Sequence, residues 1–384
     1  MIKRVFLISI PTFVGLVIGG CLWLWHPRAD VLLQLSVPVI TFEVEQQTKG
    51  RMLDHIETPA FSVNGFKSIE LTPEDGSFQV ADPRRFDFKS RRYQESAWIK
   101  LKAQHIELSP SSPSLDPQAM VIADDMDSGG TIQFKGFSAL AGSRVVIEIP
   151  GEPPFTPAPN DEDVDMLVRV TPPPAKAELT QAIVVTGPVT VHTAQCGFPG
   201  SPYRNLPATY RFTLAEGNPI LAVRAAELMM SFRLPPKWSG ALLQDGRVRA
   251  KGVRFDREIR REGRTGARLV YGQEPNRLVY PSYPDKNIQF TPPQSVVLDQ
   301  DDVFTLQVVS LNQEYTGIRL TLTGRTKKVI STAGSAPRDL HIDGLDWLKQ
   351  QTWLMKSLAF ALWSVPTTLA ILKFVKEFKA EVGS

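Results

Sequence analysis

The five histidines, the two cysteines and a few carboxylate clusters are the residues of this chain that could do chemistry. His192 stands four positions before Cys196 in the segment HTAQCGFPGSPY, which could place an imidazole beside a thiol nucleophile. On a strand that runs into a Gly/Pro loop the two side chains need not face each other, so we interpret Cys196 as a loop or half-buried cysteine. The other histidines show no metal-ligand spacing such as HExxH: His26, His55, His105 and His341.

The carboxylate clusters also have simpler interpretations. The turn 124–130, DDMDSGG, resembles part of a calcium loop but lacks the bidentate glutamate, so we interpret it as a solvated hairpin loop. Asp299, Asp301 and Asp302 are expected to mark the entrance to a strand. There is no GxSxG elbow, SxxK, P-loop or GxGxxG. The sequence therefore predicts no catalytic residue, metal or cofactor, although catalysis by scattered carboxylates stays open.

Residues 233–268 carry the most uneven charge, with eleven basic residues and four acidic ones. Arg247, Arg249 and Lys251 share one face of a predicted strand at steps of about 7 Å. The apolar positions then move to Val253 and Phe255, which predicts a β-bulge at Gly252. The set is either a solvated strand face or an anion-binding ridge for lipid head groups, acidic glycan or an acidic partner. The residues of the candidate ridge are Arg247, Arg249, Lys251 and Arg254.

The elements that would position these residues are mostly short strands. Apolar and polar residues alternate along 209–214, 304–308 and 318–323, as expected for half-buried strands. Similar runs occupy 99–108, 131–137, 145–149 and 183–193, the last interrupted by Gly187-Pro188, which predicts a bulge or hairpin. The predicted fold class is a mainly β outer region of sandwich, jelly-roll or β-roll type, lying between two single transmembrane helices.

Two further features organise this region. The stretch 150–174 contains eight prolines and an acidic run, which predicts an extended linker between an outer β domain at 30–150 and a second one at 175–338. In 219–232, Asn218 and Pro219 form a helix-start signal, so we predict a helix there, with a buried strand as the alternative.

Residues 5–25 form an uncharged apolar run of 21 positions, about 31 Å long as a helix, which predicts a first membrane span. Lys3 and Arg4 precede it, so residues 1–4 are expected to be a cytoplasmic tail. No A-x-A-like cleavage site follows the run. Ile18-Gly19-Gly20-Cys21 resembles a lipobox, so lipidation of Cys21 is the alternative to an uncleaved anchor.

The other end of the chain predicts a second span. A helix is expected to begin in the membrane-proximal segment 345–352 and to cross the bilayer over 353–372, with Lys356 snorkelling outward. The basic tail 373–384 then belongs in the cytoplasm. Small residues at four-residue spacing could let the spans pack on each other or on a partner helix; the candidate packing positions are Gly15, Gly19, Ala361, Ser364 and Thr368.

This topology places both termini inside and the bulk of the chain outside. The seven asparagines form no N-x-S/T sequon, which together with only two cysteines favours a bacterial cytoplasmic (inner) membrane with a periplasmic or extracellular domain. The net charge of +3 and the outward location argue against a nucleic-acid partner.

Three functions fit these features. The first is a non-catalytic envelope protein, serving as a scaffold or as a membrane-proximal carrier of lipid or glycan. The second is an outward-facing sensing or accessory subunit of a larger membrane complex. The third is a membrane-bound hydrolase of unknown type. The expected partners are membrane lipid, anionic lipid or glycan in particular, and another membrane protein.

Overall fold

The computed structural model of the chain divides it into two compact units. One is the β unit, Asp30–Asp339; the other comprises Met1–Ala29 and Leu340–Ser384. The structure describes residues 28–46, 52–53, 56–71, 77–81, 86–87, 92–93, 98–102, 106–110, 119–124, 132–150, 164–186, 189–197, 208–214, 220–234, 241–243, 248–255, 269, 275–283, 285–291, 294–312, 317–333 and 336–342, and the single positions 346, 356, 370, 373 and 376.

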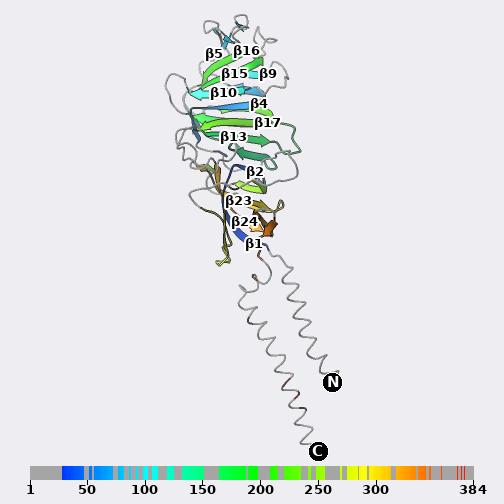
Figure 1. Cartoon of the computed structure of the whole chain (residues 1–384). Coiled ribbons are helices and arrows are strands. Elements are labelled where there is room, and N and C mark those ends of the chain that lie inside the picture. Colours follow the sequence, from blue (N-terminus) through cyan, green and yellow to red (C-terminus); the bar gives the residue numbers. More distant parts are fainter. Residues whose placement is uncertain are drawn as a thin grey trace, which may run out of the picture. The chain divides into compact units, whose positions relative to one another are not determined.

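The described part of the β unit is built from antiparallel strands, most of them joined in a single large sheet (Figure 1). The alternation of buried and exposed side chains explains why these segments form strands. In β13 (Val164–Thr171) Met166, Val168 and Val170 are buried, whereas the residues between them face solvent. The prediction that the region between the two apolar runs is β-rich is thereby confirmed.

The end of the unit labelled β1 in Figure 1, here called the base, is organised by one bent segment. β1 (Ala29–Val37) and β2 (Val39–Val44) are separated only by Pro38, which can donate no ladder hydrogen bond. β1 pairs with β24 (Gly317–Thr326) and β20 (Asn276–Val279), whereas β2 pairs with β19 (Val248–Arg254) and β12 (Arg144–Glu148). β23 (Val303–Asn312) joins β19 to β24, so these strands lead from β1 back to β2.

The second part of the sheet, here called the ladder, continues from β12, and its described strands do not lead back to their start. Figure 1 shows its strands following one another away from the base. The pairing order after β12 is β13, β17 (Ile220–Leu234), β4 (Ala60–Leu71), β10 (Ala119–Asp124), β15 (Val189–Gly197), β16 (Ala208–Leu214), β5 (Ser77–Ala81) and β8 (Trp98–Lys102). At about 4.8 Å per strand, these strands extend about 40 Å from β12.

A layer of short strands covers the buried face where the ladder begins. β14 (Leu179–Thr186) pairs with β17, then β11 (Ile132–Phe134) with β14, and β3 (Ile56–Thr58) with β11. Phe134 of this layer meets Phe61 and Phe232 of the main sheet edge-on, at centroid distances of 5.1 and 5.0 Å. These three fully buried rings form the core at this level.

The remaining strands are short. β9 (Ile106–Pro110) pairs with β4 and β15, β18 (Ala241–Leu243) with β23, and β21 (Asn287–Phe290) with β20. Two small sheets complete the described part: β22 (Ser295–Leu298), β25 (Val329–Ala333) and β26 (Ala336–Asp339) form one, and β6 (Phe86–Asp87) and β7 (Arg92–Tyr93) the other.

Two expectations from the sequence are wrong here. The segment 219–232 is not a helix but strand β17, the alternative that we left open. The stretch 150–174 is not linker throughout, because β13 lies within it and pairs with β12 and β17. The pairing of β2 with both β12 and β19 joins the two halves that we predicted as separate domains, and Asp30–Asp339 is one compact unit.

The first and last strands of the β unit lie close to each other. In β20, Val279 is the register partner of Leu32 in β1, and Tyr280 follows directly. The carboxylate of Asp339, at the end of β26, acts on Tyr280 and raises the pKa of its hydroxyl, a smaller effect than the burial of the ring. The β unit therefore begins and ends at its base.

The other unit is described at few positions. Asp346, Lys356, Ala370, Lys373 and Lys376 are helical, and all but Asp346 are exposed. Apart from Lys356 and Ala370, the predicted spans 5–25 and 353–372 lie outside the described residues, and so do all five candidate packing positions of the spans. Among the residues described, no helix combines the length and the apolar character that crossing a bilayer requires.

Candidate functional site: a basic hollow on strand β19

Strand β19 has the irregularity that the sequence predicts. Gly252 adopts φ +59°, and the pairing with β2 moves from Lys251↔Glu43 to Arg254↔Thr41, so β19 uses one residue more than β2. This is a β-bulge, and glycine accepts the left-handed backbone without the cost that a Cβ would bring. Val253 is buried beyond the bulge, whereas Lys251 and Arg254 both remain exposed on the outer side.

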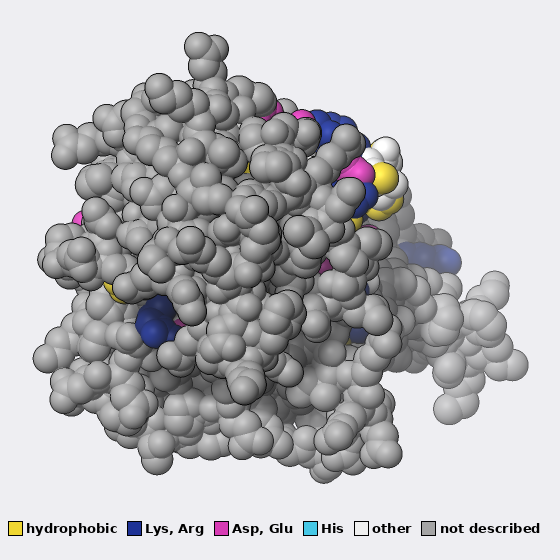
Figure 2. All heavy atoms as spheres, turned by 90° about the horizontal axis from the view of Figure 1, so that it is seen from above, with side chains coloured by type: hydrophobic (Ala, Val, Ile, Leu, Met, Phe, Trp, Pro, Cys, Tyr) yellow, Lys and Arg dark blue, Asp and Glu magenta, His cyan; other side chains and the backbone are white. Residues whose placement is uncertain are grey.

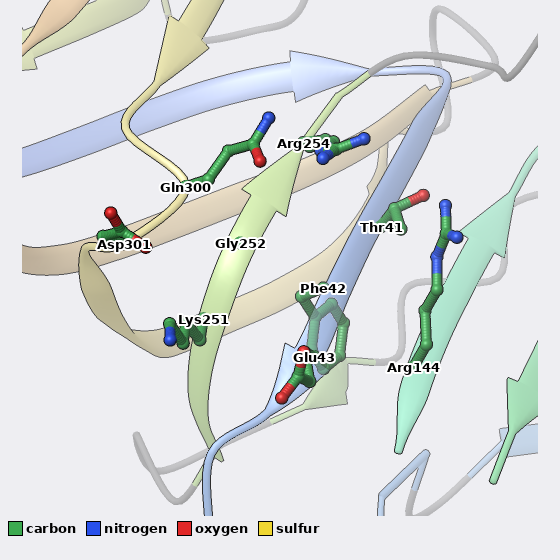
Figure 3. A pocket seen from close by; sticks show the side chains of 9 residues that line it. All are labelled: Thr41, Phe42, Glu43, Arg144, Lys251, Gly252, Arg254, Gln300 and Asp301. Atoms are coloured by element: carbon green, nitrogen blue, oxygen red, sulfur yellow. The ribbon is translucent and has the colours of Figure 1, made fainter. Parts of the chain in front are cut away.

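A hollow of about 270 Å³ opens at this bulge (Figure 3). Three strands and one loop line it: β2, β12, β19, and the turn that precedes β23. Typical pockets for drug-sized ligands begin at about 300 Å³, so this hollow has room for a small ligand or a head group. Its lining residues are Thr41, Phe42, Glu43, Arg144, Lys251, Gly252, Arg254, Gln300 and Asp301.

Strand register orders the charges in the hollow. Glu43 on the central strand β2 lies directly opposite Arg144 on β12 and Lys251 on β19. Such cross-strand neighbours of opposite charge attract each other. Arg254 on β19 lies opposite Thr41 on β2, and Thr41 is only 6% exposed. In total the lining carries three cations and two carboxylates, a formal excess of one positive charge.

The two arginines lie on either side of Thr41. In Figure 3 the guanidinium of Arg144 extends from β12 toward the hydroxyl of Thr41, and Arg254 approaches β2 from the β19 side. Glu43, Lys251 and Asp301 lie toward the other end of the hollow. Within the described part of the chain, neither Lys251 nor Arg254 forms an ion pair. The Thr41 end of the hollow is therefore rich in hydrogen-bond donors.

The structure separates the predicted ridge residues. Arg249 lies on the same strand face, but its Nε is 2.8 Å from Oε2 of Glu45, so its charge is engaged outside the hollow. Arg247 lies outside the described residues. Lys251 and Arg254 are the two predicted residues that line the hollow.

Elsewhere on the surface basic and acidic side chains are mixed. In Figure 2 basic and acidic side chains lie next to each other at the upper right of the view. Arg169 approaches Glu227 at 3.5 Å and Arg325 approaches Asp30 at 3.2 Å. Lys67 donates a hydrogen bond to Glu178 and holds the pKa of that carboxyl below its usual value. These pairs are exposed, so they add little to stability.

The other chemical candidates gain no support. His192 and Cys196 both lie on β15, with a register irregularity between Thr193 and Cys196. The turn 125–130 lies outside the described residues. Asp302 directly precedes β23 and accepts a hydrogen bond from the amide of Lys327 at 3.3 Å, which confirms the predicted strand entrance. Among the described residues no cluster of histidine, cysteine or carboxylate side chains could hold a metal.

Sequence reasoning missed two residues of the hollow, Arg144 and Thr41. Both come from strands more than a hundred positions away from β19 in the chain, and no local pattern distinguishes them. The arrangement offers guanidinium groups, an ammonium and a hydroxyl, which recognise an anion by hydrogen bonding. No family model, no curated protein and no solved structure matches this chain.

Proposed function

We propose that this protein is a non-catalytic, membrane-anchored envelope protein whose β unit serves as a scaffold on the outer side of a bacterial inner membrane. One observation supports this above all: the β unit begins and ends at its base, since Arg325 of β24 lies 3.2 Å from Asp30, and Asp339 is the register partner of Ile330 shortly after β24. Two ends that lie close together let a domain be inserted between two neighbouring spans of a hairpin topology. The apolar runs 5–25 and 353–372 are the proposed anchors.

At the start of the ladder, the described interior fits a scaffold better than a carrier of lipid chains. A carrier needs an apolar cavity, and small-molecule sites are mostly apolar hollows. Where the ladder begins, the rings of Phe61, Phe134 and Phe232 occupy the space between the layers.

The first test concerns topology. We would fuse a reporter that is active only in the cytoplasm after Ser384, and insert an extracytoplasmic reporter within 151–163, ahead of β13. The expected result is activity of both reporters. A C-terminal fusion that reports an extracytoplasmic end would overturn the hairpin arrangement.

The second test addresses the scaffold itself. We would extract the full chain with a mild detergent and identify the co-purifying proteins and lipids by mass spectrometry, with a mock extract as the control. A scaffold should retain at least one protein in a fixed ratio. Retention that Gly15→Leu with Gly19→Leu abolishes would favour an accessory subunit coupled through the spans. Recovery of the chain without any enriched protein would contradict the scaffold.

A further inference from the structure

We infer that the Thr41 end of the hollow binds a phosphate group. The structural basis is the pair of guanidinium groups of Arg144 and Arg254, which lie on the two sides of the Thr41 hydroxyl (Figure 3). The inference goes beyond the scaffold role and does not depend on it. A free phosphate ester and the phosphodiester of a lipid head group share this chemistry.

The donors favour phosphate over carboxylate. A guanidinium has donors in a planar fork that matches two oxygens of phosphate or carboxylate. A carboxylate has two oxygens in one plane, so a single guanidinium can donate a hydrogen bond to each of them. The hollow instead offers donors from β12, β2 and β19, in different directions, which suits the tetrahedral oxygens of phosphate.

The carboxylates of the hollow restrict where an anion can lie. Glu43 is opposite both Arg144 and Lys251, and Asp301 lies beside Gln300 in the turn before β23. Both repel an anion from the far end of the hollow and leave the Thr41 end as the favourable place. The formal excess of one positive charge predicts modest affinity that weakens as salt rises.

The bulge at Gly252 creates the room for this site. The extra residue of β19 places Arg254, rather than its neighbour, opposite Thr41. A Cβ on Gly252 would meet only the carbonyl oxygen of Gln300, at 3.8 Å, so the space beside the bulge is open. Without the bulge, the alternation of the strand would turn the side chain of Arg254 to the buried face.

The test uses the full chain, purified in a neutral detergent and titrated with inorganic phosphate by isothermal calorimetry. Wild type should bind saturably. Arg254→Gln removes a charge-assisted donor pair and should weaken binding by about tenfold or more. Thr41→Val keeps the shape, removes one neutral donor, and should weaken binding by roughly two- to tenfold.

The matched control is Arg169→Gln, which removes the same charge from an exposed arginine on β13 that pairs with Glu227. Its affinity should stay within about twofold of wild type. Arg254→Lys keeps the charge but loses the fork, so it should lie between wild type and Arg254→Gln. Melting curves of all variants should coincide, which separates a lost contact from a lost fold.

A second arm identifies the source of the phosphate. Short-chain phosphatidylglycerol, kept below its micellar concentration, replaces inorganic phosphate in the same titration. Binding at least tenfold tighter than that of inorganic phosphate, and still dependent on Arg254, assigns the site to a lipid head group. Equal or weaker binding assigns it to a soluble phosphate. Absence of saturable binding of both probes, or equal binding by Arg254→Gln and Arg169→Gln, overturns the inference.

Discussion

The base and the ladder of the β unit use the same antiparallel pairing, but among the described strands only those of the base return to their own start. In the base, the bend at Pro38 lets one chain segment pair with β24 through β1 and with β19 through β2. In the ladder, each strand adds to the previous one as far as β8. The hollow lies in the base, where strands from distant parts of the chain are held on several sides. The closed arrangement of strands in the base thus fixes the geometry of the hollow, whereas the successive strands of the ladder extend the sheet.

This difference raises the question of whether the two regions unfold together. β2, β12, β13 and β17 connect them by continuous pairing, and they belong to one compact unit. We therefore expect a single cooperative transition. A change made in one region should therefore be felt in the other.

Phe134→Ala should have the largest effect. It removes the ring that packs edge-on against Phe61 and Phe232 where the ladder begins, and such core truncations cost about 3–5 kcal/mol of unfolding free energy. Protection of the slowest amides should fall by that amount in peptides from β4 and β17, and equally in peptides from β23 and β24. Unchanged protection in the base would show that the two regions unfold separately.

Gly324→Ala makes the complementary change in the base. A Cβ on Gly324 would lie 2.6 Å from Cδ1 of Phe304 and 2.8 Å from the carbonyl oxygen of Val303, so β23 and β24 would have to move apart. Overpacking of this kind costs about 1–3 kcal/mol, and backbone atoms cannot yield easily, so we expect the upper end. The loss of stability in the Gly324→Ala variant is measured by thermal unfolding.

Gly252→Ala is the matched control, because its Cβ has open space and only the positive φ carries a cost, about 1–2 kcal/mol. A smaller loss of stability for Gly324→Ala than for Gly252→Ala would contradict the close approach of β23 and β24.

These regions also differ in how far sequence predicts them. Ile318, Leu320 and Leu322 alternate strictly and are buried in β24 as expected. In β17 the buried positions include Leu221, Ala225, Leu228 and Phe232, whose spacing also fits one face of a helix. The register irregularity around Ala225 adds a residue to the strand, which produces that helical period.

The candidate site was predictable only in part. The change of phase at Gly252 identifies the bulge, Lys251 and Arg254 within one strand. Arg144 and Thr41 join them through strand pairing, and pairing between distant segments leaves no local pattern in the sequence. The pairing of Arg249 with Glu45 was equally invisible, because Glu45 follows β2.

The base should show an alkaline transition that depends on Tyr280. Burial of the ring, assisted by Asp339, raises the pKa of the hydroxyl, so the folded protein holds this proton more tightly than the unfolded one. Stability from this difference is complete below about pH 10 and falls as the pH rises above it. Tyr280→Phe should flatten the loss of melting temperature between pH 9 and 11. Parallel wild-type and variant curves would disprove this.

The smallest effect is expected at the ladder surface. Lys67 lowers the pKa of Glu178, so this pair stabilises the folded state above the ordinary carboxyl pKa and ceases to do so as the pH falls through the lowered value. The pair is exposed, and Glu178→Gln should leave the melting temperature at pH 7 unchanged within error. A clear drop would mean that this surface is less accessible to water than its exposure indicates.

The two ends of the β unit lie close together, because Asp30 contacts Arg325 and Asp339 pairs with Ile330, so the unit is a self-contained module. For the chain on either side, everything between Asp30 and Asp339 occupies the place of a short loop. Replacing the whole unit with a few glycine and serine residues should therefore leave the flanking segments joined without strain. For the same reason the unit could be moved into a surface loop of another protein and keep its own core.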